Sequence, residues 1–256
     1  MINLKTLSGP REILVIRHGE SVLNVHRQHM PPYKGLMSRL RTIHPKLAYL
    51  AAELMIRFTK GIPLIHPQSD AEAALTEAGR ALSFLRAVSL LENNLIPDLI
   101  ITSTYKRANQ TAQIIRDVIY ENTGQKIKLI VFSFLREKEA GNFFRVPLHY
   151  FNELEPDYKK EQIEKGKYFH RFQDGESTQD LVKRIDQKLN EVLTLAAPDS
   201  RVMFVAHGHV NMVLHGLLTG TDIQLLTNQN FFVMPNLDIK HYQLNHEKEK
   251  YQEVRQ

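Results

Sequence analysis

The chain has 256 residues, of which 43% are hydrophobic and 24% are charged, proportions typical of a globular protein with a core of useful size. It contains no cysteine, which excludes disulfides, thiolate metal ligands and a cysteine nucleophile. No stretch approaches the roughly 20 apolar residues of a membrane span, and the N-terminal residues lack the apolar run of a signal peptide. We therefore expect a cytoplasmic protein without a membrane span.

Strand-like and helical patterns alternate along the chain. Short apolar runs typical of buried strands occur at residues 12–17, 98–102, 127–132, 201–206 and 239–244. Helical patterns occur at residues 76–92, 107–123, 178–195 and 210–218. This alternation predicts an α/β fold of three layers, in which helices cover both faces of a mainly parallel sheet. We expect one domain over residues 1–256, ending in a charged, disordered tail at 247–256.

Residues 25–68 form the most basic part of the sequence. They hold seven lysines and arginines and one acid, a local charge of +6, which leaves −1 for the rest of a chain whose total is +5. Irregular connections with proline and glycine surround an apolar stripe at helical spacing, made of Leu47, Leu50, Ala51, Leu54, Met55 and Phe58. We interpret the segment as an insertion with a helix packed on the main body. A lid over a ligand site, or a contact surface for a partner or a membrane, is the alternative.

Polar residues follow the predicted strands, where parallel sheets bind their ligands. The first strand leads into Arg17-His18-Gly19, the second ends at Thr102-Ser103, and a late one leads into His207-Gly208. A neutral imidazole can attack phosphorus, arginine offers a permanent positive fork for phosphate oxygens, and glycine lets a phosphate approach the backbone. His18 is therefore a candidate nucleophile, with a purely structural histidine as the alternative.

The segment Arg17-His18-Gly19-Glu20-Ser21, with Asn24 three residues further on, resembles the signature that opens histidine phosphatases and cofactor-dependent phosphoglycerate mutases. Further blocks resemble that family in the family's own order: LTEAGR at 75–80, TSTYKRANQTA at 102–112, LREKEAGNF at 135–143, GES at 175–177, VAHG at 205–208 and PN at 235–236. Because these blocks extend over nearly the whole chain, the sequence is identified as a member of the histidine phosphatase (phosphoglycerate mutase-like) superfamily, in its phosphatase branch.

The resemblance implies a phosphoglycerate mutase-like fold and a phosphoryl-transfer site that needs neither a metal nor a cofactor. It implies that His18 is the nucleophile and that Glu137 donates a proton to the leaving group, with Glu139 as the rival acid. The implied phosphate cradle consists of Arg17, Arg107 and His207. Candidate substrate contacts are Ser21, Asn24, Glu139, Gly208 and His209. For Ser21 a role in shaping the loop is the alternative, and the role of His209 stays open.

A phosphatase, in which water accepts the phosphoryl group, is favoured over a mutase. The block EKEAGNF at 137–143 lacks the arginine and aromatic pair that resemblance to a mutase would require. A non-catalytic binder of phosphorylated partners is disfavoured because the implied nucleophile, acid and cradle are all present. A nucleic-acid-binding role would rest on residues 25–68, which contain few aromatics and no recognisable module. We expect a small phosphorylated substrate, of a class that the sequence leaves open together with the oligomeric state.

Overall fold

The computed structural model describes residues 9–29, 69–141, 156–171, 174–247 and 249–254. Most of the predicted insertion at 25–68 therefore lies outside the described residues, apart from its first five positions. Asn142 and Phe143, the last two residues of the block at 135–143, also lie outside them.

The described residues contain one six-stranded sheet, in the order β3-β2-β4-β1-β5-β6. The strands are β1 (Glu12–Arg17), β2 (Leu99–Ser103), β3 (Lys128–Phe132), β4 (Arg201–Ala206), β5 (Ile239–Asn245) and β6 (Lys250–Glu253). The first four strands pair in parallel, whereas β5 is antiparallel to β1 and β6 is antiparallel to β5. The prediction of a mainly parallel sheet is confirmed.

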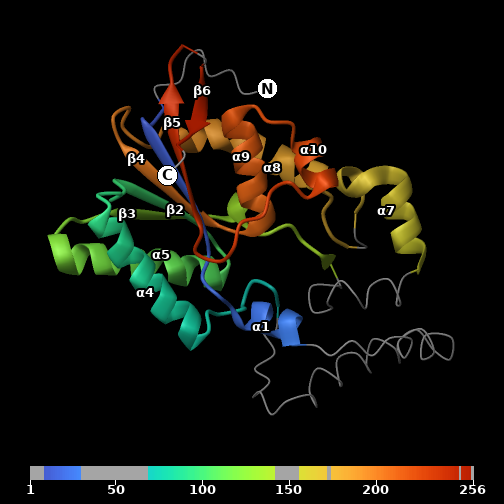
Figure 1. Cartoon of the computed structure of the whole chain (residues 1–256), viewed down its shortest axis with the longest axis horizontal. Helices are drawn as coiled ribbons and strands as arrows, with labels where there is room; N and C mark the ends of the chain where they lie inside the picture. The colour runs from blue at the N-terminus through green and yellow to red at the C-terminus, as the bar shows by residue number, and fades with distance from the viewer. Residues whose placement is uncertain (1–8, 30–68, 142–155, 172–173, 248, 255–256) are drawn as a thin grey trace.

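Helices cover both faces of this sheet (Figure 1). The structure describes α1 (Val22–His29), α4 (Glu77–Glu92), α5 (Lys106–Thr123), α7 (Pro156–Phe169), α8 (Thr178–Leu193), α9 (Gly208–Thr219), α10 (Ile223–Gln229) and a 3-10 turn, η2 (Ser133–Leu135). Successive residues of β1 point to opposite faces. Ile13 and Val15 join a core cluster with α8 and α9, while Leu14 and Ile16 join a second cluster with α4 and α5. The three predicted layers are therefore present.

Local sequence signals explain where the covering helices begin. The Thr76 side chain accepts a hydrogen bond from the backbone N–H of Gly79 and caps α4. Ser177 and Asp180 form a reciprocal capping box at the start of α8. Gly79 also allows α4 to approach the loop after β1, because a Cβ at that position would lie 2.0 Å from the Glu20 carbonyl oxygen. The start of α4 is thereby fixed against this loop.

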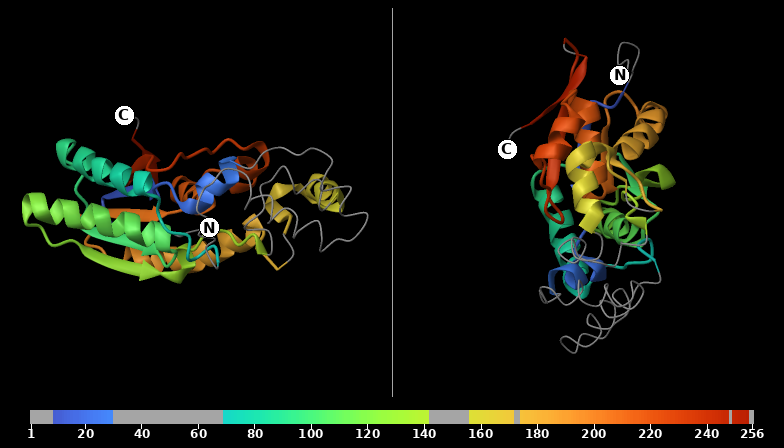
Figure 2. Two further views of the ribbon diagram at one scale, coloured as in Figure 1. Left: turned by 90° about the horizontal axis from the view of Figure 1, so that it is seen from below. Right: turned by 90° about the vertical axis from the view of Figure 1, so that its right-hand side faces the viewer.

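Parts of the fold differ from the sequence prediction. The tail expected to be disordered from residue 247 contains β6, which pairs with β5. Tyr251 is buried, and its hydroxyl donates a 2.7 Å hydrogen bond to the Pro10 carbonyl. One buried aromatic side chain and the free edge of β5 therefore order β6, whose other residues are charged or polar. Helix α7, which was not predicted, lies at the end of the molecule remote from α4 and α5, beside α10 (Figures 1 and 2).

Candidate active site

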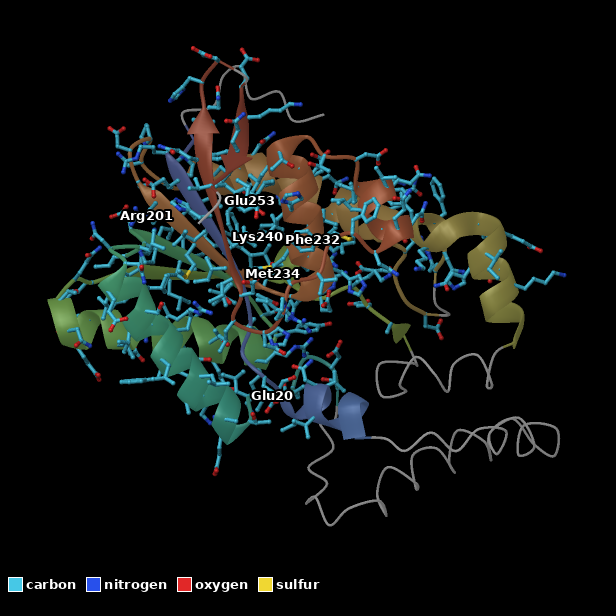
Figure 3. The ribbon with its side chains drawn as sticks, in the orientation of Figure 1. Glu20, Arg201, Phe232, Met234, Lys240 and Glu253 are labelled. Carbon is cyan, nitrogen blue, oxygen red and sulfur yellow. The ribbon has the colours of Figure 1, made fainter. Side chains whose placement is uncertain are left out.

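The carboxyl ends of three parallel strands bring the predicted residues together. Arg17 at the end of β1 pairs with Ala206 at the end of β4, so His18 and His207 follow neighbouring strands at the same level. Their ring centroids lie 5.1 Å apart in an edge-to-face arrangement. Figure 3 labels Glu20 beyond this end of the sheet and Arg201 at the opposite end. The site therefore lies where ligands bind in parallel α/β sheets.

The tautomer of His18 follows from its hydrogen bonds. The ring is buried, and Nδ1 lies 2.7 Å from the Gly19 carbonyl oxygen, to which only an N–H can donate. Nε2 is consequently the unprotonated nitrogen, and it accepts a 3.1 Å hydrogen bond from Arg107 Nε. Burial, together with the positive charges of Arg107 and Arg17, holds the pKa of His18 well below its ordinary value. The imidazole is therefore neutral at neutral pH, with Nε2 unprotonated.

The loop that carries His18 is fixed by hydrogen bonds on both sides. Asn236 donates from Nδ2 to the His18 carbonyl at 2.7 Å, and the Gly19 backbone N–H donates to Thr111 Oγ1 at 3.0 Å. The ring is thus held by its surroundings and has little freedom to rotate.

Two arginines reach this histidine from different elements. Arg107 lies in the first turn of α5, where it is buried and pairs through Nη1 with the backbone oxygen and the carboxylate of Asp70, at 2.6 and 2.9 Å. Arg17 donates from Nη1 to the Met234 carbonyl at 2.8 Å. A Cβ at Gly208 would lie 3.9 Å from Arg17 Cζ and would fill the space beside the guanidinium. The glycine keeps that face of Arg17 open.

His207 is fully buried and has one hydrogen-bonded nitrogen. Nε2 lies 3.0 Å from Ser103 Oγ, which also accepts from the Tyr105 backbone N–H at 3.1 Å. In the described part of the structure, Nε2 is the acceptor within reach of the Ser103 hydroxyl proton, which favours a proton on His207 Nδ1. Burial and the charge of Arg107 hold the pKa of His207 well below its ordinary value, although Glu137 opposes the shift.

Two donors at the site lack partners. Among the described residues, His207 Nδ1 and Arg17 Nε are buried without a hydrogen-bond partner. Unpaired buried donors carry a desolvation penalty, so each of them calls for an explanation. An oxyanion placed beside His18 would satisfy them, so the geometry suits a group with several anionic oxygens.

Glu137 reaches the same site from the loop after η2. Its Oε1 accepts a 2.8 Å hydrogen bond from the Lys138 backbone N–H and lies 3.5 Å from His209 Nδ1. Burial raises the pKa of Glu137, but the contact with His209 and its charge, together with the hydrogen bond from the Lys138 backbone N–H, outweigh burial and bring this pKa well below its ordinary value. Glu137 is therefore a carboxylate at neutral pH in this state.

Glu139 belongs to a framework of ion pairs. Its Oε1 accepts from Arg136 Nε at 2.7 Å, and its backbone N–H and C=O both bond to Glu176. Arg184 holds Glu176 with two hydrogen bonds, at 2.9 and 2.6 Å, and also binds the Phe134 carbonyl. The Glu139 carboxylate is 43% exposed. These contacts hold the loop of Glu137 against α8. The negative charge of Glu139 is balanced by Arg136.

Ser21 and Asn24 bond to each other. Asn24 Oδ1 accepts from the backbone N–H and the hydroxyl of Ser21, at 3.0 and 2.9 Å. Ser21 is buried and forms an isolated bridge with Leu75. Its hydroxyl therefore shapes the turn into α1, which agrees with the alternative role considered for it.

Several residues of the site escaped the sequence prediction as functional positions. Ser103 is among the polar residues expected at the strand ends, but the sequence assigns it no role at the site. Tyr105 packs its ring against His207 at 5.3 Å and under the Arg107 guanidinium at 5.1 Å. Asp70 precedes α4 in a stretch without periodicity, and only its contact with Arg107 reveals it.

The described part of the chain shows no group of three or more histidines, aspartates or glutamates arranged to hold a metal ion. Within the same residues, no helix has the length and apolar character required to cross a membrane.

Fold and site define a three-layer α/β protein that gathers two neutral histidines, two arginines and a carboxylate at the end of its sheet. The chain belongs to the histidine phosphatase superfamily (branch 1), whose family model matches residues 63–256. The match begins at residue 63, so the Arg17-His18-Gly19 motif lies outside it. The motif is therefore a resemblance to the family beyond the matched stretch. No curated protein sequence matches the chain.

Solved structures with the same fold include several phosphatases. A mycobacterial glucosyl-3-phosphoglycerate phosphatase in complex with VO3 is 20% identical, with a TM-score of 0.64 over 95% of this chain and 96% of that one. The alpha-ribazole phosphatase from Shigella flexneri is 15% identical, with a TM-score of 0.64 over 95% and 94% of the two chains. A mycobacterial hydrolase is 19% identical, with a TM-score of 0.65 over 96% and 97%. At these identities the likeness establishes the fold.

Proposed function

We propose that this protein is a phosphatase that hydrolyses small phosphomonoesters through a phosphohistidine intermediate on His18. The observation that carries the proposal is the state of His18. Its Nδ1 is bonded to the Gly19 carbonyl, its Nε2 is unprotonated, and its pKa is held well below the ordinary value by burial and neighbouring charge. A fixed, neutral imidazole with an unprotonated Nε2 is what in-line attack on phosphorus requires.

The surrounding donors suit the charge of a transferring phosphoryl group. That group spreads negative charge over three equatorial oxygens, so catalysis depends mainly on positioning and electrostatic stabilisation. In the proposed complex Arg17 Nε and His207 Nδ1, both without partners in the described structure, donate to these oxygens. Arg107 turns its hydrogen bond from His18 Nε2 to a phosphate oxygen, and Gly208 leaves room beside Arg17.

The reaction proceeds in two balanced steps. In the first, the lone pair of His18 Nε2 forms a bond to phosphorus, the bond from phosphorus to the ester oxygen breaks, and Glu137 gives its proton to the leaving alkoxide. In the second, a water oxygen attacks phosphorus and passes a proton to the Glu137 carboxylate. The N–P bond then breaks, and its electron pair returns to Nε2. Phosphate and an alcohol leave, and His18 and Glu137 regain their starting states.

The charge of the substrate explains how Glu137 serves both steps. Without substrate, the contact with His209 and its charge outweigh burial and keep the pKa of Glu137 low. The first step returns Glu137 to this ionised form, which is the base of the second step. A phosphate dianion brings opposite charge into the site and raises the pKa of a nearby carboxyl group. Binding of the substrate therefore favours the protonated acid that the first step needs.

Water is the proposed acceptor of the phosphoryl group. A mutase would return the phosphoryl group to the substrate, and its acid block would be expected to carry an arginine and an aromatic pair in place of Lys138-Glu139-Ala140. Structural neighbours named as phosphatases agree with hydrolysis. Their named substrates, glucosyl-3-phosphoglycerate and alpha-ribazole phosphate, belong in a test panel and are not assigned to this chain.

The test combines turnover with trapping of the intermediate. The full chain should release phosphate from members of a phosphomonoester panel in the presence of a metal chelator, and quenched turnover should leave an acid-labile, base-stable phosphate on the protein. His18→Ala should abolish both signals, while His246→Ala, which changes an exposed histidine, should abolish neither. An active His18→Ala enzyme would refute the mechanism, and transfer to a phosphoglycerate without phosphate release would indicate a mutase.

A further inference from the structure

One exposed histidine faces the carboxylate of the active site. His209 is the second residue of α9, and its side chain is 52% exposed, whereas the side chain of Glu137 is 18% exposed. His209 Nδ1 lies 3.5 Å from Glu137 Oε1. One edge of the His209 ring therefore faces solvent and the other faces the group to which the proposed function assigns proton transfer.

The packing of α9 does not explain this histidine. The next residues of the helix, Val210, Asn211, Met212, Val213 and Leu214, are all buried. His209 is exposed at the start of this buried run, and Glu137 is its recorded partner. The position tolerates any polar residue on packing grounds, so the contact with Glu137 is the feature that calls for an explanation.

Glu137 is already oriented without His209. The Lys138 backbone N–H donates to Glu137 Oε1 at 2.8 Å, and its loop is tied to α8 through Glu176. What His209 adds is charge. An imidazolium at 3.5 Å stabilises a carboxylate, and imidazole is the side chain that gains or loses its charge between about pH 5 and pH 8.

Other charged groups also face Glu137, and they differ from His209 in what they can do. Arg17 from β1 is permanently charged, and Lys138 lies on the same loop. His207 lies between β4 and α9, where burial holds its pKa well below the ordinary value. Among these groups, His209 alone combines an imidazole with an exposed ring, so it can exchange protons directly with solvent.

We propose that His209 is a positioning residue for Glu137, whose imidazolium charge keeps this carboxylate ionised during the second step, in which it activates water. The proposal rests on the assignment of Glu137 as the acid and base of the phosphatase. It replaces the open substrate-contact role of His209 with an action through Glu137.

The consequence is a shift in pH dependence. With p-nitrophenyl phosphate the leaving group needs little protonation, so the acid limb of kcat reports loss of the Glu137 carboxylate. Removing a positive charge 3.5 Å away raises the pKa of that carboxyl group, which moves the limb to higher pH by about one pH unit in water-like surroundings. A neutral glutamine removes the charge, and an arginine keeps it.

The experiment measures kcat and KM for p-nitrophenyl phosphate between about pH 4 and pH 8 in the full-length enzyme and in His209→Gln, His209→Arg and Glu137→Gln. We expect the acid limb to move up in His209→Gln, to keep its wild-type position in His209→Arg, and to disappear in Glu137→Gln. An unmoved limb in His209→Gln would overturn the inference, and a raised KM with that unmoved limb would identify a substrate contact instead. Equal shifts in the glutamine and arginine variants would also overturn it, because charge would not be the cause.

The Glu137→Gln profile separates this inference from the proposed function. If that variant keeps the wild-type acid limb, Glu137 is not the base, and the assignment fails together with the inference. If the limb is lost in Glu137→Gln and unmoved in His209→Gln, the assignment stands and only the role of His209 is wrong.

Discussion

At the residue scale, two glutamates in one loop have different environments. Glu137 faces the two histidines at the start of α9, whereas Glu139 is bound to Arg136 and 43% exposed. The two lie two positions apart, and the family resemblance favoured Glu137 as the acid with Glu139 as its rival. The two glutamates differ in environment because Arg136 forms an ion pair with Glu139. Arg136 is in turn held by Glu176, a tertiary contact that the local sequence does not indicate.

The two glutamates can be distinguished by the leaving group. Glu137→Gln should slow hydrolysis of alkyl phosphates by roughly 100-fold or more, and that of p-nitrophenyl phosphate much less, because a poor leaving group depends on a proton donor. Glu139→Gln removes one side of the Arg136 contact and should lower both rates mildly and equally. Steady-state kinetics on both substrates provide the measurement. A larger, leaving-group-dependent loss in Glu139→Gln would reverse the assignment.

The predictable part of the site consists of residues with a local signal. His18 and His207 follow apolar strands, so strand-end reasoning and family resemblance both found them, whereas Arg107 was found by the resemblance. Asp70 and Tyr105 had no such signal. Asp70 comes from the segment before α4 and meets Arg107 only through tertiary packing, a relation that periodicity does not encode.

At the element scale, predictability follows the apolar pattern. The bounds of β1 and β4 agree with the prediction because both strands are buried and bordered by polar residues. Helix α7 is rich in lysine and glutamate and contains Gly166 at φ 74°, so no apolar stripe marks it. Strand β6 has four residues and one buried side chain, which is too short a pattern to recognise.

Strand β6 should contribute to stability through Tyr251. Tyr251→Ala should lower the free energy of unfolding by about 3–5 kcal/mol, the usual cost of deleting a buried aromatic side chain, and Tyr251→Phe by about 1 kcal/mol through loss of the hydrogen bond to Pro10. Urea unfolding provides the measurement. Tyr120→Ala on α5, which removes a 49% exposed tyrosine, is the matched control and should change stability by less than about 0.5 kcal/mol. Equal effects of the two alanine variants would mean that β6 is not anchored in the core.

At the scale of the whole molecule, the buried histidines couple stability to pH. The pKa values of His18 and His207 are held well below 6.5, first by burial and then by Arg107. Below about pH 6.5 the unfolded chain binds protons at these positions and the folded chain does not, so stability falls as pH falls. Each such histidine contributes a slope of up to about 1.4 kcal/mol per pH unit.

Replacing one of these histidines should reduce that slope. Between about pH 6.5 and pH 5, the free energy of unfolding should fall less steeply with pH in His207→Asn than in the wild type. The two slopes should differ by at most the contribution of one bound proton, about 1.4 kcal/mol per pH unit. Urea titrations at several pH values measure the slope. His246→Asn, at an exposed position, should keep the wild-type slope. An unchanged slope in His207→Asn would show that His207 binds a proton in the folded state.

The segment from residue 25 to 68 is joined to the site at both described ends. Ser21, just before α1, forms a bridge with Leu75, and Asp70 holds Arg107 beside His18. The segment between them carries +6 in a chain otherwise near neutral. We propose that this charge draws anionic substrates toward the site, because charge beside a binding site raises encounter rates by roughly 10-fold or more at low salt.

The electrostatic role of this segment predicts a salt-dependent rate. Neutralising Arg39, Arg41 and Lys46 to glutamine together should lower kcat/KM for multiply charged substrates several-fold at low salt and flatten its dependence on ionic strength. The effect should shrink near physiological salt, where the Debye length is about 8 Å. Simple aryl phosphates should be little affected, because His18 and its arginines are unchanged.

The matched control changes three basic residues remote from the site to glutamine: Arg116 on α5, Lys128 on β3 and Lys126 in the loop between them. It removes the same charge elsewhere and should keep most of the wild-type salt dependence. If the two triple variants behaved alike, net charge alone would account for the rate, and the segment would have no steering role of its own.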